Sequence, residues 1–172
     1  MKKYTGYVLA SVAALGLVFS VSAAEASGGN KVRERCKVRA DGVGKLDARW
    51  EIKKVGTSRE RRRFRAQFEA RDDSGLLAGA LIDVYVSTVT DPVAVPPVEE
   101  MVMVGQMILK QDDDQDGDGD GDLEGKLRFD TKPHSSSTHP WQPFPAVWPT
   151  DVAEGTTVEL RNGEASLLAC DL

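Results

Sequence analysis

Apolar and polar residues alternate strictly in several stretches of the chain, which is the pattern of half-buried β-strands. The clearest stretch is RRRFRAQFEAR, in which four apolar residues are spaced two positions apart: Phe64, Ala66, Phe68 and Ala70. Because successive side chains of a strand point to opposite faces, these four lie on one face and charged side chains cover the other. KLDARWEIK and LEGKLRF repeat the pattern. The alternation therefore predicts strands that bury one face each.

Four further stretches complete an all-β pattern. ALIDVYVSTV and EEMVMVGQMILK are apolar and β-rich, while TTVEL and ASLLACDL are separated by Arg161-Asn162-Gly163, which is a hairpin signal. No window after the N-terminal apolar segment has the three-four spacing of a helix. We predict an antiparallel β-sandwich of the immunoglobulin-like type, with a closed barrel as the alternative. Its seven or eight strands are expected at about 33–40, 44–55, 61–71, 79–89, 99–110, 122–130, 156–161 and 165–171.

The same stretches carry a resemblance to known proteins. RRRFRAQFEAR, GALIDVYV, MVGQMIL, LEGKLRFDT and FPAVWPTDVAEGTTVELRNGEASLLAC resemble a loose group of small exported bacterial proteins over residues 60–171. That group shares an Arg-Phe strand, a strand ending in a Gly turn, and a final hairpin similar to G-V-ELRNG. The resemblance implies a β-sandwich. It implies no catalytic residues, because the group has no assigned activity.

The N-terminal residues have the composition of a secretory signal. Lys2 and Lys3 precede the apolar run YVLASVAALGLVFSVSAA, which is too short for a stable membrane span and ends in small residues. We predict a signal peptide at 1–24, with cleavage after residue 24 or 26, and an uncleaved N-terminal anchor as the alternative. The rest forms one domain, 31–172, that is periplasmic or extracellular and has no membrane span after cleavage.

Export changes the interpretation of the two cysteines, Cys36 and Cys170. Two cysteines in an oxidising compartment usually pair, and the alternative is a pair of separate buried thiols. A disulfide requires the two Cα atoms to come within about 7 Å of each other. We therefore predict a disulfide that joins the first and last strands, which must be neighbours or face each other across the core.

An acidic run, QDDDQDGDGDGD, occupies the predicted loop 111–122. It matches the first half of an EF-hand loop in three registers, but each register places Leu123, Gly125 or Leu127 where the bidentate Glu belongs. The flanking strands also exclude a helix-pair sensor. We predict weak Ca²⁺ binding, with a Kd of about 10⁻⁴–10⁻³ M. The alternatives are a solvated hairpin loop and an acidic tip that contacts a partner. The predicted ligands are Asp112, Asp114, Asp116, Asp118, Asp120 and Asp122.

A second long loop, 131–155, is rich in proline and aromatic residues. Trp141 and Trp148 are candidate ligand contacts, because exposed tryptophans can stack on sugars. The alternative is that Phe144 and Trp148 plug the open end of the sandwich. His134 and His139 lack the further ligands of a tetrahedral metal site and the nucleophile elbow of a hydrolase. We therefore expect no catalytic residues and no enzyme activity.

The charge balance restricts the partners. The net charge is −5, and it becomes −7 (20 − 27) when the signal with its two lysines is removed. This acidity argues against nucleic acid. The basic stretch RERRRFR puts Arg61, Arg63 and Arg65 on one face, where pairs with Asp47 or Glu51 are the simple explanation and a polyanion-binding face is the alternative.

These observations predict a non-catalytic exported protein with a structural or interaction role and a weak calcium site. Its partner is expected to be a protein or a glycan. The alternative functions are a carbohydrate-binding module that uses Trp141 and Trp148, and an enzyme built on the 131–155 loop.

Overall fold

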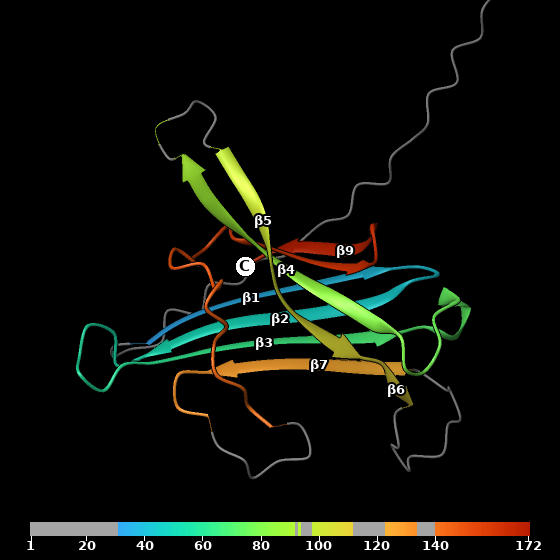
Figure 1. The fold of residues 1–172 in the computed structure, drawn as a ribbon, viewed down its shortest axis with the longest axis horizontal. Coiled ribbons are helices and arrows are strands. Elements are labelled where there is room, and N and C mark those ends of the chain that lie inside the picture. The colour runs from blue at the N-terminus through green and yellow to red at the C-terminus, as the bar shows by residue number, and fades with distance from the viewer. Residues whose placement is uncertain (1–30, 92, 94–97, 112–122, 134–139) are drawn as a thin grey trace, which may run out of the picture.

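Two antiparallel sheets face each other in the computed structural model, which describes residues 31–91, 93, 98–111, 123–133 and 140–172 (Figure 1). One sheet has the strand order β1-β2-β3-β7-β6 and the other β5-β4-β8-β9. The predicted all-β sandwich is confirmed. Within the described ranges no helix is long and apolar enough to cross a bilayer. The strands are β1 Lys31–Ala40, β2 Gly44–Lys53, β3 Arg61–Ala70, β4 Leu81–Asp91, β5 Val98–Ile108, β6 Lys110–Gln111, β7 Leu123–Asp130, β8 Thr157–Asn162 and β9 Ala165–Asp171, and a 3-10 turn covers Asp72–Ser74.

The core forms where the alternating apolar residues of the two sheets meet. Phe64 and Phe68 of β3 are fully buried in one continuous cluster that also contains Val84 and Val86 of β4. The opposite, outward positions of β1, β2, β3 and β7 carry mainly charged side chains. The alternation in the sequence therefore assigns the faces of these strands correctly.

One predicted strand, 99–110, is divided between the two sheets. β5 pairs with β4, whereas β6 pairs with β7, so the chain changes sheets at Leu109. The amide of Leu109 donates a 3.0 Å hydrogen bond to the carbonyl of Ala80, and the amide of Gly79 donates a 2.8 Å bond to the carbonyl of Leu109. Gly125 of β7 allows this crossing, because a Cβ there would lie 2.8 Å from the sulfur of Met107.

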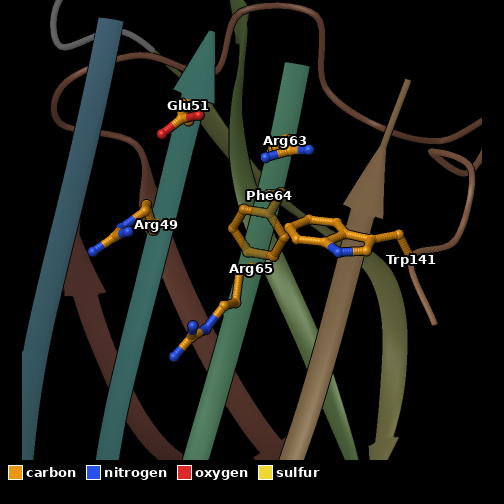
Figure 2. A pocket seen from close by; sticks show the side chains of 6 residues that line it. All are labelled: Arg49, Glu51, Arg63, Phe64, Arg65 and Trp141. Atoms are coloured by element: carbon orange, nitrogen blue, oxygen red, sulfur yellow. The ribbon is translucent and has the colours of Figure 1, made fainter. Parts of the chain in front are cut away.

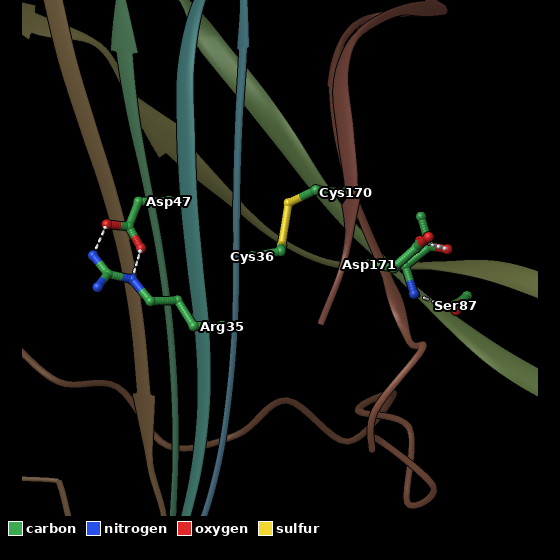
Figure 3. Close-up of a disulfide and its surroundings, with 7 residues drawn as sticks. Arg35, Cys36, Asp47, Ser87, Cys170 and Asp171 are labelled. Atoms are coloured by element: carbon green, nitrogen blue, oxygen red, sulfur yellow. Dashed lines mark hydrogen bonds and ion pairs between the residues drawn. A yellow bond between two sulfur atoms is a disulfide. The ribbon is translucent and has the colours of Figure 1, made fainter. Parts of the chain in front are cut away.

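A disulfide closes the other side of the sandwich. Cys36 of β1 and Cys170 of β9 are bonded, with Cα atoms 5.9 Å apart and a sequence separation of 134 (Figure 3). β1 and β9 are edge strands of different sheets, so the bond joins the two layers. The predicted link between the first and last strands is confirmed, and it is consistent with an oxidising compartment.

The proline-rich segment after β7 returns alongside that strand. The amide of Asp130 donates a 2.9 Å hydrogen bond to the carbonyl of Gln142, and the amide of Gln142 donates a 2.9 Å bond to the carbonyl of Arg128. Trp141 and Phe144, on either side of this pairing along the chain, contact different parts of the molecule. Trp141 lies against the outward guanidinium groups, whereas Phe144 packs against the core.

Candidate functional site

The outer face of the five-stranded sheet carries a large local excess of positive charge. The outward positions of β1, β2, β3 and β7 hold thirteen lysine or arginine and five acidic side chains, a net of +8 (13 − 5). The whole chain has a net charge of −5. Opposite charges are therefore separated over the molecule, and this face attracts anions even though the chain as a whole is acidic.

Four arginines stand directly opposite one another across four neighbouring strands. Arg35 of β1 pairs in register with Arg49 of β2, Arg49 with Arg65 of β3, and Arg65 with Arg128 of β7. We call these four residues the arginine row. Like charges directly opposite each other on a sheet are destabilising. The row is therefore a feature that stability alone does not explain.

The carboxylate on one side of the row, Asp47, is held by Arg35, the row's first member, and by Lys37. Asp47 accepts hydrogen bonds of 3.0 and 2.5 Å from Arg35 and lies 3.6 Å from Lys37 (Figure 3). Burial alone would raise the pKa of Asp47, but the hydrogen bond and charge of Arg35 hold it below its ordinary value. Asp47 is thus ionised, and both of its carboxylate oxygens accept hydrogen bonds from Arg35 at the β1 end of the row.

Glu51 is held in the same way on the other side of the row. Its carboxylate lies 3.3 Å from Lys31, 3.3 Å from Arg33 and 3.0 Å from Lys53. Burial would raise the pKa of Glu51, but the hydrogen bonds and charges of Lys53 and Lys31 hold it below its usual range. Its charge is therefore already balanced by lysine and arginine outside the row.

Asp130, at the end of β7, is the most enclosed acid of this face. It is 0% exposed and accepts hydrogen bonds of 2.8 and 2.6 Å from Arg61, 2.9 Å from Arg63 and 2.9 Å from the amide of Lys132. Burial would raise the pKa of Asp130, but these hydrogen bonds lower it below its ordinary value. Glu51 is the cross-strand neighbour of Arg63, as predicted, but the ion pairs of Arg61 and Arg63 are made with Asp130, because β7 also lies beside β3 and supplies a closer carboxylate.

The two central members of the row make no ion pair within the part of the chain that the structure describes. Arg65 donates a hydrogen bond to Gln67. Arg49 lies between Arg35 on β1 and Arg65 on β3, the two strands that flank β2. Burial lowers the pKa of Arg49, and the neighbouring charges of Arg35 and Arg33 lower it further. Burial and the charge of Arg65 likewise lower the pKa of Arg128. The charged guanidinium groups thus lie in surroundings that disfavour them.

A pocket of about 140 Å³ opens beside the two central arginines of the row. It is lined by Arg49, Glu51, Arg63, Phe64, Arg65 and Trp141. Figure 2 shows Trp141 reaching over β7 towards the arginines of β3. The guanidinium carbon of Arg63 lies 5.1 Å from the centre of the Trp141 ring, and that of Arg128 lies 5.9 Å from it. These are cation–π distances. The pocket thus combines two arginines of the row, Arg49 and Arg65, with the aromatic ring of Trp141.

The two tryptophans predicted as ligand contacts are not brought together. Trp148 packs within the end of the core, with its ring centre 4.9 Å from that of Phe64, 4.8 Å from Phe144 and 5.7 Å from Trp50. Trp141 is half-buried beside the pocket. Of this pair, Trp141 therefore belongs to the candidate site, and Trp148 belongs to the packing beneath it.

The predicted calcium ligands, Asp112 to Asp122, lie outside the described residues, as do His134 and His139. The strand ends that flank the acidic run are paired, with Gln111 opposite Leu123. Among the described residues, no group of three or more His, Cys, Asp or Glu side chains could hold a metal ion. The calcium site stays a prediction.

Sequence reasoning singled out Arg65 but missed Arg49 and Arg128. A signal was present, since each is an outward residue in the middle of an alternating strand. The register that places them side by side becomes visible only in the folded sheet.

No protein-family model matches this chain, and no curated protein or solved structure matches it. The resemblance to small exported bacterial proteins stays a prediction. The function therefore has to be argued from the site itself.

Proposed function

We propose that this protein is a non-catalytic exported binding protein that holds an anionic ligand on the outer face of its five-stranded sheet. The observation that carries the proposal is the pair Arg49 and Arg65. These two arginines are opposite each other, line the same pocket and make no ion pair in the described part of the chain. The acids nearest to the row are engaged by cations other than Arg49 and Arg65.

The chemistry of the pair suits a carboxylate, sulfate or phosphate group. A guanidinium group presents a rigid fork of donors that matches such oxyanions with two parallel hydrogen bonds. A bound anion would also relieve the repulsion between Arg49 and Arg65 that the sheet register imposes. Because the pocket is half-enclosed, that attraction is screened less than it would be on an open surface.

The lining of the pocket supports binding more than catalysis. Its six residues are three arginines, one glutamate and two aromatic residues. The glutamate is Glu51, whose lowered pKa keeps it ionised near neutral pH and makes it a poor proton donor. None of the six supplies a hydroxyl, thiol or imidazole nucleophile.

Export is part of the proposal and has two supports. One is the N-terminal signal predicted from the sequence. The other is the disulfide between Cys36 and Cys170, a bond that forms and persists in oxidising compartments.

Thermal unfolding of the mature protein tests the anion site. Sodium sulfate or D-galacturonate, at ionic strength matched with sodium chloride, should raise the Tm saturably, by about 3 °C at ten times the Kd. The double variant Arg49→Gln/Arg65→Gln should abolish the shift. The control Arg39→Gln/Arg59→Gln removes the same charge from exposed positions outside the row and should retain it. A shift of equal size in both variants, or none in the wild type, would refute the proposal.

A further inference from the structure

We infer that the natural ligand of this face is an acidic polysaccharide that lies across the strands along the arginine row. The inference rests on the anion-binding function proposed above and specifies the class of ligand. Three features of the face carry it: the spacing of the row, the carboxylates that border it, and the position of Trp141.

The spacing of the row fits a linear chain with regularly repeated charges. Neighbouring strands lie about 4.7–4.9 Å apart, so four arginines in register span roughly 14 Å. One pyranose unit of an extended polysaccharide has a length close to that strand spacing. Successive uronate carboxylates or sulfate groups can therefore lie along the row, meeting Arg49 and Arg65 at its centre and extending at the ends to Arg35, which also holds Asp47, and Arg128.

The bordering carboxylates restrict the positive charge to a narrow strip. Glu51 and Asp130 lie one step along the strands on one side of the row, and Asp47 lies one step along on the other. A broad acidic protein surface would bring its own carboxylates against these three. A thin polyanion that crosses the strands follows the arginines and comes near only Glu51, whose charge is already balanced, so charge complementarity favours it.

Trp141 adds the surface that a sugar ring uses and a simple polyphosphate does not. Its ring lies beside Arg63 and Arg128 and lines the pocket with Arg49 and Arg65. An aromatic ring packs well against the apolar face of a pyranose while the arginines bind its acidic group. A single-stranded nucleic acid would need a series of rings for successive bases, whereas Trp141 is the one aromatic ring of the pocket lining that is not in the core.

Calorimetric titration with oligogalacturonates of increasing length is the test. Affinity should rise from monomer to dimer to tetramer, by at least about tenfold overall, because each added carboxylate meets one more guanidinium group. It should then level off between tetramer and hexamer, since the row has four members. Malto-oligosaccharides of the same lengths are the neutral control and should not bind.

Four variants separate the contributions to this binding. Arg49→Gln/Arg65→Gln should remove the length dependence, whereas the exposed control Arg39→Gln/Arg59→Gln should keep it. Arg49→Lys/Arg65→Lys retains the charge and guards against a folding defect, and it should bind with intermediate affinity because lysine lacks the fork. Trp141→Ala should weaken tetramer binding about tenfold and weaken sulfate binding less, because sulfate has no apolar face to pack on the ring.

The possible failures are distinguishable. If the monomer binds through Arg49 and Arg65 as tightly as the tetramer, the polysaccharide is refuted and the anion site stands. A polyphosphate or an oligodeoxynucleotide of equal charge that binds as tightly as the tetramer would also overturn the glycan assignment. If no anion binds at all, the proposed function fails together with the inference.

Discussion

At the scale of single residues, Arg49 carries the strongest argument for a binding site. It lies between Arg35 and Arg65 in the register of three strands, and both burial and neighbouring charge lower its pKa. A sheet selected for stability alone would place an acidic residue here. Residues that break a local rule without a structural gain are commonly found at functional sites.

Replacing Arg49 should therefore stabilise the protein in the absence of ligand. We expect Arg49→Gln to raise the free energy of unfolding by about 0.2–1 kcal/mol at low ionic strength, because it removes like-charge pairs across the strands. The gain should shrink in about 1 M sodium chloride, where the Debye length is about 3 Å. Urea denaturation at both salt concentrations measures it. A loss of stability at low salt would mean that Arg49 is held by favourable contacts.

Asp130 should behave in the opposite way. Asp130→Asn removes the acceptor shared by Arg61 and Arg63 and should cost about 1.5–3 kcal/mol at pH 7. The pKa of Asp130 is lowered in the folded state, so its contribution is fully present above the unfolded pKa of about 3.9 and is lost as pH falls through the folded value. Urea midpoints of wild type and variant should differ at pH 7, and the difference should shrink as the pH falls below about 3.9. A constant difference over this range would exclude the ionised pair as its source.

At the scale of strands, the hydrophobic pattern predicts the faces but not the neighbours. The alternation around Phe64 and Phe68 places the arginines of β3 on the outer face without any knowledge of the fold. It does not show that β7, far along the chain, lies beside β3 and brings Arg128 next to Arg65. The ion pair of Arg63 with Asp130, in place of its cross-strand neighbour Glu51, has the same cause. Long-range register is set by packing across the whole sheet, and local sequence carries little of it.

The connection between β6 and β7 is an element whose role the sequence predicts and the described residues do not test. With a Kd near 1 mM, 10 mM CaCl₂ should raise the Tm of the mature protein by about 3 °C. Replacing 112–122 by Asn-Gly keeps the pairing of Gln111 with Leu123 and should abolish this shift. MgCl₂ at the same concentration is the control for ionic strength. An equal rise in Tm in the shortened variant would show that calcium binds to another part of the protein.

At the scale of the whole molecule, closure of the sandwich rests on two different devices. On one side the chain itself crosses between sheets at Leu109, and on the other Cys36 and Cys170 are bonded. The cysteine positions and the export signal predicted the second device from the sequence. The first was not predicted, because 99–110 has the pattern of a single continuous strand.

Removing the disulfide should be costly, because it closes a long loop of chain. For a separation of 134 residues, the chain-entropy model gives about 4–5 kcal/mol for Cys36→Ser/Cys170→Ser. Urea denaturation of the variant and of the oxidised wild type measures the difference, and the reduced wild type is the matched control. Equal midpoints in the oxidised and reduced proteins would show that packing between β1 and β9 holds the layers without the bond.

The central claim is that the molecule carries its ligand on the arginine row of an otherwise acidic protein. The most direct measurement is a titration of the isotope-labelled mature protein with tetragalacturonate, followed by NMR through the backbone amides and the arginine side-chain N–H groups. We predict saturable shifts at Arg49 and Arg65, with smaller shifts at Trp141, and none on β8 and β9. Shifts that avoid the row, or that are confined to the four-stranded sheet, would contradict the account.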